Sequence, residues 1–145
     1  MASVRGCNIP EDLSYNVDNN VWARREADGT VTVGLTAYAC SLAGEIVAYT
    51  PKKAGKDIAK DKSCATVESG KWVGPVKTPV TGSVVSINDA VASKPGLINK
   101  DPYGEGWVVK MKPNDWDGES KSLKAGGDAV AAFEAKMDSE GFKGC

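Results

Sequence analysis

The chain has 145 residues, a length typical of one domain that buries a hydrophobic core without disulfide support. Its net charge is −1 and its isoelectric point is near 5.5, which exclude the strongly basic surface typical of nucleic-acid binding. Histidine is absent from the sequence. Its absence removes the usual Cys–His and Ser–His nucleophile pairs and the commonest transition-metal ligand, which disfavours a self-contained hydrolase or metalloenzyme.

The N-terminal part of the sequence predicts a strand hairpin followed by a short helix. Residues 20–25 and 30–35 predict two strands, and the Asp28-Gly29 pair between them is typical of a tight hairpin turn. Residues 37–42 predict a short helix, which Gly44 is expected to end. The sequence therefore predicts a β-rich beginning with one helical connection.

Strands are also predicted on both sides of Lys71. Residues 63–67 and residues 82–87 read as strands, so Lys71 is expected at the tip of a hairpin, with its stem fixed and its amine in water. Residues 45–49 come directly after Gly44, and residues 82–87 begin with Gly82. In both segments apolar residues alternate with other residues after the glycine, a repeat that suits a sandwich with approximate two-fold symmetry. The spacing by itself also fits an ordinary solvated turn lysine.

The C-terminal part of the sequence predicts a last strand and then a helix. Residues 107–111 predict the strand. Beyond it, Asp128 is expected to cap an amphipathic helix that Gly141 ends and that carries three apolar residues on one face: Val130, Phe133 and Met137. We expect residues 1–113 to form the main domain and residues 114–145 to form an extension that packs on it.

Several segments between residues 8 and 113 resemble, in order and separation, the glycine cleavage H protein family. They are Asn8–Leu13, Trp22–Arg24, Val31–Thr36, Gly44–Val47, Glu68–Lys71, Pro79–Gly82 and Asn99–Trp107. The resemblance implies a mainly β fold, a barrel-sandwich hybrid of the lipoyl and biotinyl type. This fold has two antiparallel sheets with short flanking helices, to which the sequence adds a C-terminal helix. The resemblance also implies that the main domain is a lipoyl-carrier domain.

The neighbours of Lys71 distinguish lipoate from biotin as the attached group. Biotin acceptors place methionine on both sides of the lysine, whereas here Gly70 and Trp72 flank it and Glu68-Ser69 precede it. The resemblance therefore implies that Lys71 is an N6-lipoyllysine, joined to lipoate through an amide. The residues expected to mark the modification site for recognition are Glu68, Ser69, Gly70 and Trp72. No catalytic residue and no metal ligand is implied, because a carrier's chemistry resides in its cofactor and its partner enzymes.

Departures from the usual family pattern indicate a particular branch. The chain has Asn20-Val21 where the family usually has His-Glu, Gly70-Lys71-Trp72 where it has Val-Lys-Ala, and Cys7 just before Asn8. These features resemble the lipoate-binding proteins (LbpA) of sulfur-oxidising bacteria and archaea. That resemblance implies an arm that shuttles sulfur-compound intermediates and electrons in heterodisulfide-reductase-like sulfur oxidation. The alternative is a glycine cleavage system H protein, which carries an aminomethyl group.

A carrier of this kind is expected to be a cytoplasmic monomer and not an enzyme. No stretch of the sequence has the length and apolar character of a membrane span, and we see no signal sequence. The resemblance implies three kinds of partner: the heterodisulfide-reductase-like complex, lipoate ligase or lipoyl synthesis enzymes, and dihydrolipoamide dehydrogenase. Neither nucleic acid nor a membrane is expected among the partners.

The four cysteines are far apart and include no Cys-x-x-Cys pair, so thiols are favoured over a disulfide framework in a reducing compartment. Cys64 is expected to be a small core residue on a strand, and Cys145, the terminal residue, is expected to be disordered. Cys7 and Cys40 are the candidate arm-proximal thiols, able to exchange with a lipoyl group if they lie close to it.

Overall fold

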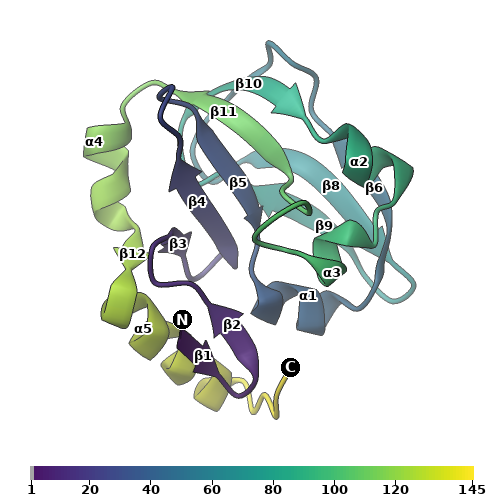
Figure 1. Cartoon of the computed structure of the whole chain (residues 1–145), viewed down its shortest axis with the longest axis vertical. Coiled ribbons are helices and arrows are strands. Elements are labelled where there is room, and N and C mark those ends of the chain that lie inside the picture. Colours follow the sequence, from purple (N-terminus) through teal and green to yellow (C-terminus); the bar gives the residue numbers. More distant parts are fainter. Residues whose placement is uncertain (1) are drawn as a thin grey trace.

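Short strands build two antiparallel sheets flanked by helices (Figure 1). Buried and exposed side chains alternate along β9 (Val73–Lys77), whereas every residue of the central strand β5 (Val31–Leu35) is buried. The structure, a computed structural model, describes residues 2–145. The larger sheet has the strand order β12-β3-β4-β5-β11-β10-β7. Its strands are β3 Ser14–Asn16, β4 Val21–Arg25, β5 Val31–Leu35, β7 Asp57–Ile58, β10 Gly82–Ile87, β11 Val109–Pro113 and β12 Lys124–Ala125. The mainly β fold expected from the sequence is confirmed.

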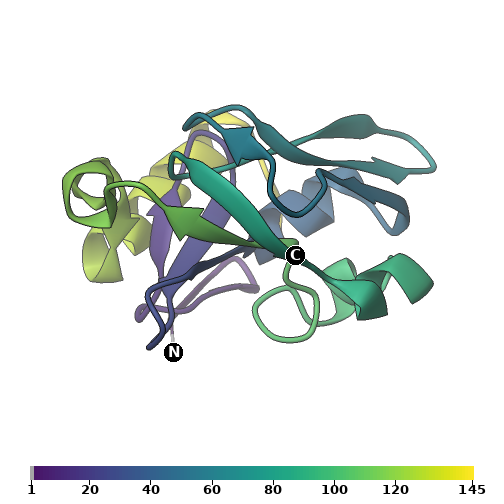
Figure 2. The same ribbon diagram turned by 90° about the horizontal axis from the view of Figure 1, so that it is seen from above.

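The smaller sheet has the order β6-β8-β9, with β6 at Ile46–Pro51, β8 at Ser63–Ser69 and β9 at Val73–Lys77. A separate antiparallel hairpin joins β1 (Ala2–Val4) to β2 (Cys7–Ile9). In the view of Figure 2, helix α1 lies between the smaller sheet and the pair of helices α2 and α3. Strands β8 and β9 of the smaller sheet form a hairpin, and residues of this hairpin line a cavity together with residues of α1.

Short helices and a 3₁₀ turn occupy connections between strands, and a longer helix follows the last strand. They are α1 Ala37–Ala43, α2 Asp89–Ser93, α3 Leu97–Lys100, α4 Trp116–Glu119, a 3₁₀ turn at Ser120–Ser122, and α5 Gly126–Ser139. Helix α1 begins where Thr36 Oγ1 accepts a hydrogen bond from Ala39 N, and it ends at Gly44, as the sequence predicts. Within residues 2–145, no helix combines the length and the apolar character that crossing a bilayer requires.

Two clusters of buried apolar side chains form the core. The first contains residues of both sheets and of α1, among them Val33, Val67 and Met111. The second lies under the N-terminal hairpin and α5, and it includes Trp22. The indole of Trp22 occupies space that Gly34 leaves free, because a β-carbon at Gly34 would lie 2.5 Å from Trp22 Cε2.

Two expectations from the sequence are wrong in detail. The strand opposite residues 63–67 is β9, whereas residues 82–87 form β10 in the larger sheet. Strand β9 contains Gly74 and Pro75, residues that weaken a strand pattern, and so it was missed. Helix α5 begins at Gly126, so Asp128 lies in its first turn and does not cap it.

Helix α5 packs its apolar face onto aromatic residues of the second cluster. Phe133 is fully buried, and its ring centroid lies 5.4 Å from that of Tyr15 and 6.4 Å from that of Tyr38. The side chains that pack on this face link residues 114–145 to the main domain. We therefore propose that the chain unfolds as one cooperative unit.

Replacing Phe133 with alanine should lower the free energy of unfolding by about 3–5 kcal/mol, because it removes a fully buried aromatic side chain. Replacing Glu134, which is exposed on the same helix, should change it by less than about 0.5 kcal/mol. Urea unfolding followed by tryptophan fluorescence and by far-ultraviolet circular dichroism measures both. A separate early transition in the Phe133→Ala variant, with the main transition unmoved, would contradict the single-unit proposal.

Candidate functional site

Lys71 lies at the exposed tip of the hairpin between β8 and β9. The tip is closed by the backbone of its two flanking residues, since Ser69 N donates a hydrogen bond to Trp72 O at 2.7 Å. Inside the turn, Lys71 N donates to Ser69 Oγ at 3.3 Å, and Ser69 itself is buried. Ser69 therefore fixes the backbone of the turn, while Lys71 remains an exposed residue.

The stem of Lys71 packs against the end of helix α1. A β-carbon placed on Gly44 would lie 3.2 Å from Lys71 Cε and 3.9 Å from Lys71 Cδ. Gly44 has φ +82° and ψ −175°, a backbone conformation that is essentially restricted to glycine. The backbone conformation therefore requires glycine at the end of α1, and the lysine stem packs closely over this glycine.

Asn99 holds this end of α1 in place. Its Nδ2 donates a hydrogen bond to Gly44 O at 2.8 Å, and its Oδ1 accepts one from Ile46 N at 2.8 Å. Sequence reasoning singled out the segments that contain Gly44 and Asn99 without giving Asn99 a role. The structure shows that the two segments meet beside Lys71, which only the tertiary fold could reveal.

Trp72 lines an apolar cavity next to Lys71. Its indole lies over β9, because a β-carbon on Gly74 would be 2.1 Å from Trp72 Cζ2. The cavity has a volume of about 210 Å³. Its lining residues are Asn19, Asn20, Leu35, Ala39, Leu42, Ala43, Trp72 and Pro75. This apolar cavity is large enough for a small apolar group to be buried beside the lysine tip.

Several large apolar side chains stay exposed around the tip. They are Leu42, Val47, Trp72 and Val73, which we call the apolar rim. Val47 is the extra residue of a β-bulge, since Ile46 pairs with Ser69 and Ala48 pairs with Glu68. Exposed apolar groups gathered around one site indicate a surface that contacts another molecule.

Glu68 and Gly70, also predicted to mark the site for recognition, lie on the hairpin beside Lys71. Glu68 is exposed on β8 opposite Val73, and Gly70 has open space around it. Among residues 2–145 we find no cluster of three or more cysteine, aspartate or glutamate side chains placed to hold a metal ion.

The cysteines differ from the expectation of four free thiols. Cys7 and Cys145 form a disulfide with their Cα atoms 5.1 Å apart, so Cys7 is not a thiol and Cys145 is ordered. These residues are 138 positions apart, and only the docking of the C-terminal segment on β2 brings them together. A sequence pattern could not show this pairing.

Cys40 and Cys64 are the free cysteines, and both are buried. Burial raises the pKa of each thiol to about 12, and their Sγ atoms donate hydrogen bonds to Ile98 O at 3.4 Å and Val76 O at 3.3 Å, respectively. Because the thiolate is the reactive form, neither is a ready nucleophile. Cys64 is a core residue, as predicted.

Comparison with known proteins places the chain among relatives of similar sequence. Residues 13–136 match the family described as Glycine cleavage H-protein. The chain is 47% identical over 147 residues to Glycine cleavage system H protein 5 of Aquifex aeolicus (strain VF5), covering 99% of each chain. It is 44% identical over 136 residues to H protein 2 of the same organism, covering 94% of this chain and 84% of the other.

A solved structure is similar as well. It is a crystal structure described as a glycine cleavage system H protein from Mycobacterium marinum, which superimposes with a TM-score of 0.71 at 30% identity. The match covers 92% of this chain and 100% of the other. The shared fold therefore extends over almost the whole chain.

Replacing Gly44 with alanine should lower the free energy of unfolding by about 1–3 kcal/mol, because the backbone conformation at Gly44 is strained for any residue with a β-carbon. Gly70→Ala is the matched control, since Gly70 lies one residue before Lys71, has a φ outside the positive range and has open space around it. Chemical denaturation measures both variants. Equal destabilisation by the two substitutions would contradict the prediction that a β-carbon at Gly44 strains the backbone.

Proposed function

The chain belongs to the glycine cleavage H-protein family, and from that premise we propose that it is a lipoyl carrier with lipoate attached through an amide to Lys71. Members of this family carry lipoate covalently on a lysine and act as carriers, not as catalysts. The observation that supports Lys71 as the acceptor is its place at an exposed hairpin tip whose backbone Ser69 fixes. A fixed turn lets a modifying enzyme select one lysine among many.

The residues around Lys71 fit an attached lipoyl group. Such a group supplies a dithiolane that alternates between disulfide and dithiol and can hold a substrate fragment. Gly44 supports the lysine stem, and the cavity lined by Trp72 and Leu42 offers apolar surface against which an apolar ring can pack. The apolar rim surrounds the base of the arm and is suited to contact with a modifying or partner enzyme.

For the cargo, the names of the relatives support an aminomethyl group, as in the glycine cleavage system. This role was the alternative interpretation of the sequence, and the comparisons favour it over the sulfur-oxidation role. Its partners would be the enzymes of glycine cleavage, together with a lipoate ligase or lipoyl synthesis enzymes and dihydrolipoamide dehydrogenase. The cytoplasmic location and the monomeric state stay predictions.

A second candidate is a sulfur-compound carrier that works with a heterodisulfide-reductase-like complex. The observation that favours it is the exposed Trp72 beside Lys71, where the family pattern has a small residue. A bulky indole changes the surface that a glycine decarboxylase must contact. In addition, one organism holds at least two relatives of this chain, which leaves room for a member with a different cargo.

The attachment site is tested by mass. Co-expression with a lipoate ligase should add about 188 Da to the wild-type chain but not to Lys71→Arg, which keeps the charge and removes the acylable amine. Lys77→Arg is the matched control, because Lys77 is exposed on the same hairpin at the end of β9. Lipoylation of Lys71→Arg, or its loss in Lys77→Arg alone, would contradict the assignment.

The cargo is tested by glycine–bicarbonate exchange with purified glycine decarboxylase. The aminomethyl candidate predicts that the lipoylated wild type supports exchange and that Lys71→Arg does not. If Trp72 is a central contact with the decarboxylase, Trp72→Ala should weaken the interaction by about 2 kcal/mol, roughly thirtyfold in affinity. Exchange that is absent in the lipoylated wild type, with turnover by a heterodisulfide-reductase-like complex, would instead support the sulfur candidate.

A further inference from the structure

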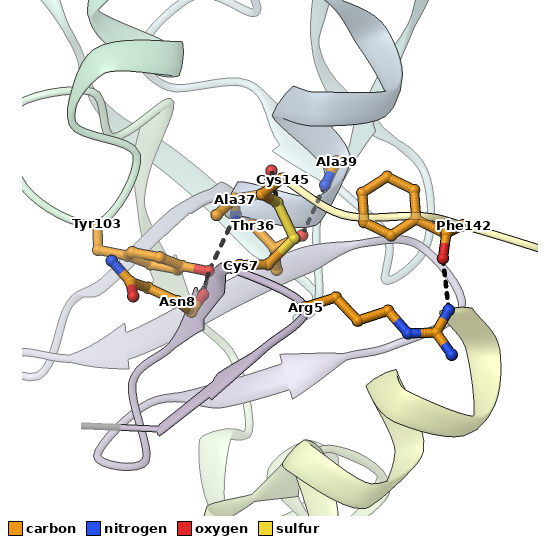
Figure 3. Close-up of a disulfide and its surroundings, with 9 residues drawn as sticks. All are labelled: Arg5, Cys7, Asn8, Thr36, Ala37, Ala39, Tyr103, Phe142 and Cys145. Atoms are coloured by element: carbon orange, nitrogen blue, oxygen red, sulfur yellow. Dashed lines mark hydrogen bonds between the residues drawn. A yellow bond between two sulfur atoms is a disulfide. The ribbon is translucent and has the colours of Figure 1, made fainter. Parts of the chain in front are cut away.

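The Cys7–Cys145 disulfide has one buried and one exposed residue. Cys7 lies in β2 and is fully buried, whereas Cys145 is the exposed last residue of the chain. Figure 3 shows Cys145 beside Ala37 at the beginning of α1, and its Sγ lies 3.7 Å from Ala37 O. The disulfide therefore lies at one end of α1, and its Cys145 half belongs to an exposed residue that lines a surface groove.

A groove beside α1 is lined at one point by Cys145 of this disulfide. Its lining residues are Ala37, Cys40, Ser41, Asn99 and Cys145, and its volume is about 270 Å³. Ala37, Cys40 and Ser41 share one face of α1 because they are three and four positions apart. At the other end of the helix, Asn99 binds Gly44 O, and Gly44 supports the Lys71 stem. This α1 groove therefore extends from Cys145 to Asn99, which binds the residue that the Lys71 stem contacts.

The length of helix α1 matches the reach of a lipoyl arm. Helix α1 has seven residues, so Gly44 lies about 10 Å from Ala37 along the axis. An extended lipoyl chain reaches about 8–10 Å beyond Lys71 Nζ, at roughly 1.3 Å per bond. The sulfur atoms of an arm that lies along the groove would arrive at Cys145.

We propose that the Cys7–Cys145 disulfide is an internal redox partner of the lipoyl arm, exchanging two electrons with it by thiol–disulfide exchange at Cys145. This inference rests on the proposed lipoylation of Lys71. The Cys7–Cys145 bond breaks and gains two electrons and two protons to give two thiols. The dithiol of the arm loses the same two electrons and two protons and forms its own S–S bond, so no further reactant is needed.

The exposure of the two sulfur-bearing residues sets the direction of attack. Cys145 is open to an incoming thiolate, and the buried Cys7 is the leaving group. Cys40 also lines the α1 groove, but burial raises the pKa of its thiol to about 12, so it stays protonated while the exchange takes place. The disulfide, not Cys40, is the group in the groove that can accept electrons.

The tail keeps its position after the disulfide is reduced, so the exchange is reversible. Cys145 N donates a hydrogen bond to Arg5 O at 2.9 Å, and the Arg5 side chain pairs with Asp138 and donates to Phe142 O. The Phe142 ring packs edge-on against Tyr38, with centroids 4.7 Å apart. These contacts hold the Cys145 thiol next to the groove without the covalent bond.

The test counts electrons. The lipoylated protein is reduced anaerobically with NADH and a catalytic amount of dihydrolipoamide dehydrogenase. The total NADH consumed per chain is measured when the reaction is complete. The wild type should consume two NADH per chain, one for the arm and one for the disulfide, since each is a two-electron couple. Alkylation and peptide mass mapping of the same sample should show Cys7 and Cys145 as free thiols, a readout that needs no variant.

Three variants separate the explanations. Lipoylated Cys145→Ser should consume one NADH per chain, and Lys71→Arg should consume none and keep its disulfide. Lipoylated Cys40→Ala should still consume two. A wild type that carries the lipoyl mass but consumes one NADH, with Cys7 and Cys145 still joined, would overturn the inference and leave the lipoyl carrier intact; absence of the lipoyl mass would overturn both.

The exchange should also take place within one chain. A tethered arm has an effective concentration in the mM range, so at about 10 µM protein the internal reaction should be about 100-fold faster than transfer between chains. Mixing lipoylated Cys145→Ser with Lys71→Arg measures the transfer between chains. Reduction of the Lys71→Arg disulfide in this mixture as fast as in the lipoylated wild type would contradict an internal partner.

Discussion

The end of helix α1 at Gly44 is the constraint on which the arrangement of the site depends. Gly44 N donates to Cys40 O and its carbonyl accepts from Asn99, while its φ of +82° turns the chain out of the helix toward β6. With no β-carbon at this position, the stem of Lys71 lies directly over the backbone. A hairpin tip by itself would leave a long lysine side chain free in solvent, whereas this contact sets where an attached arm begins.

Helix α1 separates two different environments for whatever the lysine carries. On one face, Ala39, Leu42 and Ala43 line the apolar cavity, and on the other face Cys40 and Ser41 line the groove that leads to the disulfide. An apolar group gains free energy by entering the cavity, because apolar surface leaves water. In the groove, a dithiol would meet the disulfide that we propose as its electron acceptor. The oxidation state and cargo of the arm would thus bias which side of α1 it occupies.

Much of the fold follows from local sequence signals that agree with tertiary packing. The Asp28-Gly29 turn, the helix ended by Gly44 and the exposed Lys71 were all predictable, because each depends on residues close together in the chain. Strand β9 was not predictable in the same way. It has two buried positions, and one of them, Gly74, has no side chain, so the apolar alternation typical of a strand is missing from its sequence. That glycine is explained only by the indole of Trp72, which lies over it.

The parts of the site that the sequence did not predict depend on contacts between distant residues. Asn99 serves Lys71 only through Gly44, and no spacing rule relates the three positions. The disulfide likewise requires the chain ends to meet, although cysteines in a reducing compartment are usually thiols. A sequence lists the groups that can react, and the long-range packing decides which of them are neighbours.

The C-terminal segment belongs to the lysine site as much as to the core. From one side, Lys136 Nζ donates to Asn20 Oδ1 at 3.0 Å, and Asn20 lines the apolar cavity. From the other side, Cys145 lines the groove, and Phe142 packs against Tyr38 of α1. The segment therefore supports both faces of the helix that positions the arm. Loosening it would shift α1, and with α1 the base of the arm, although no residue of the segment lies in the Lys71 hairpin.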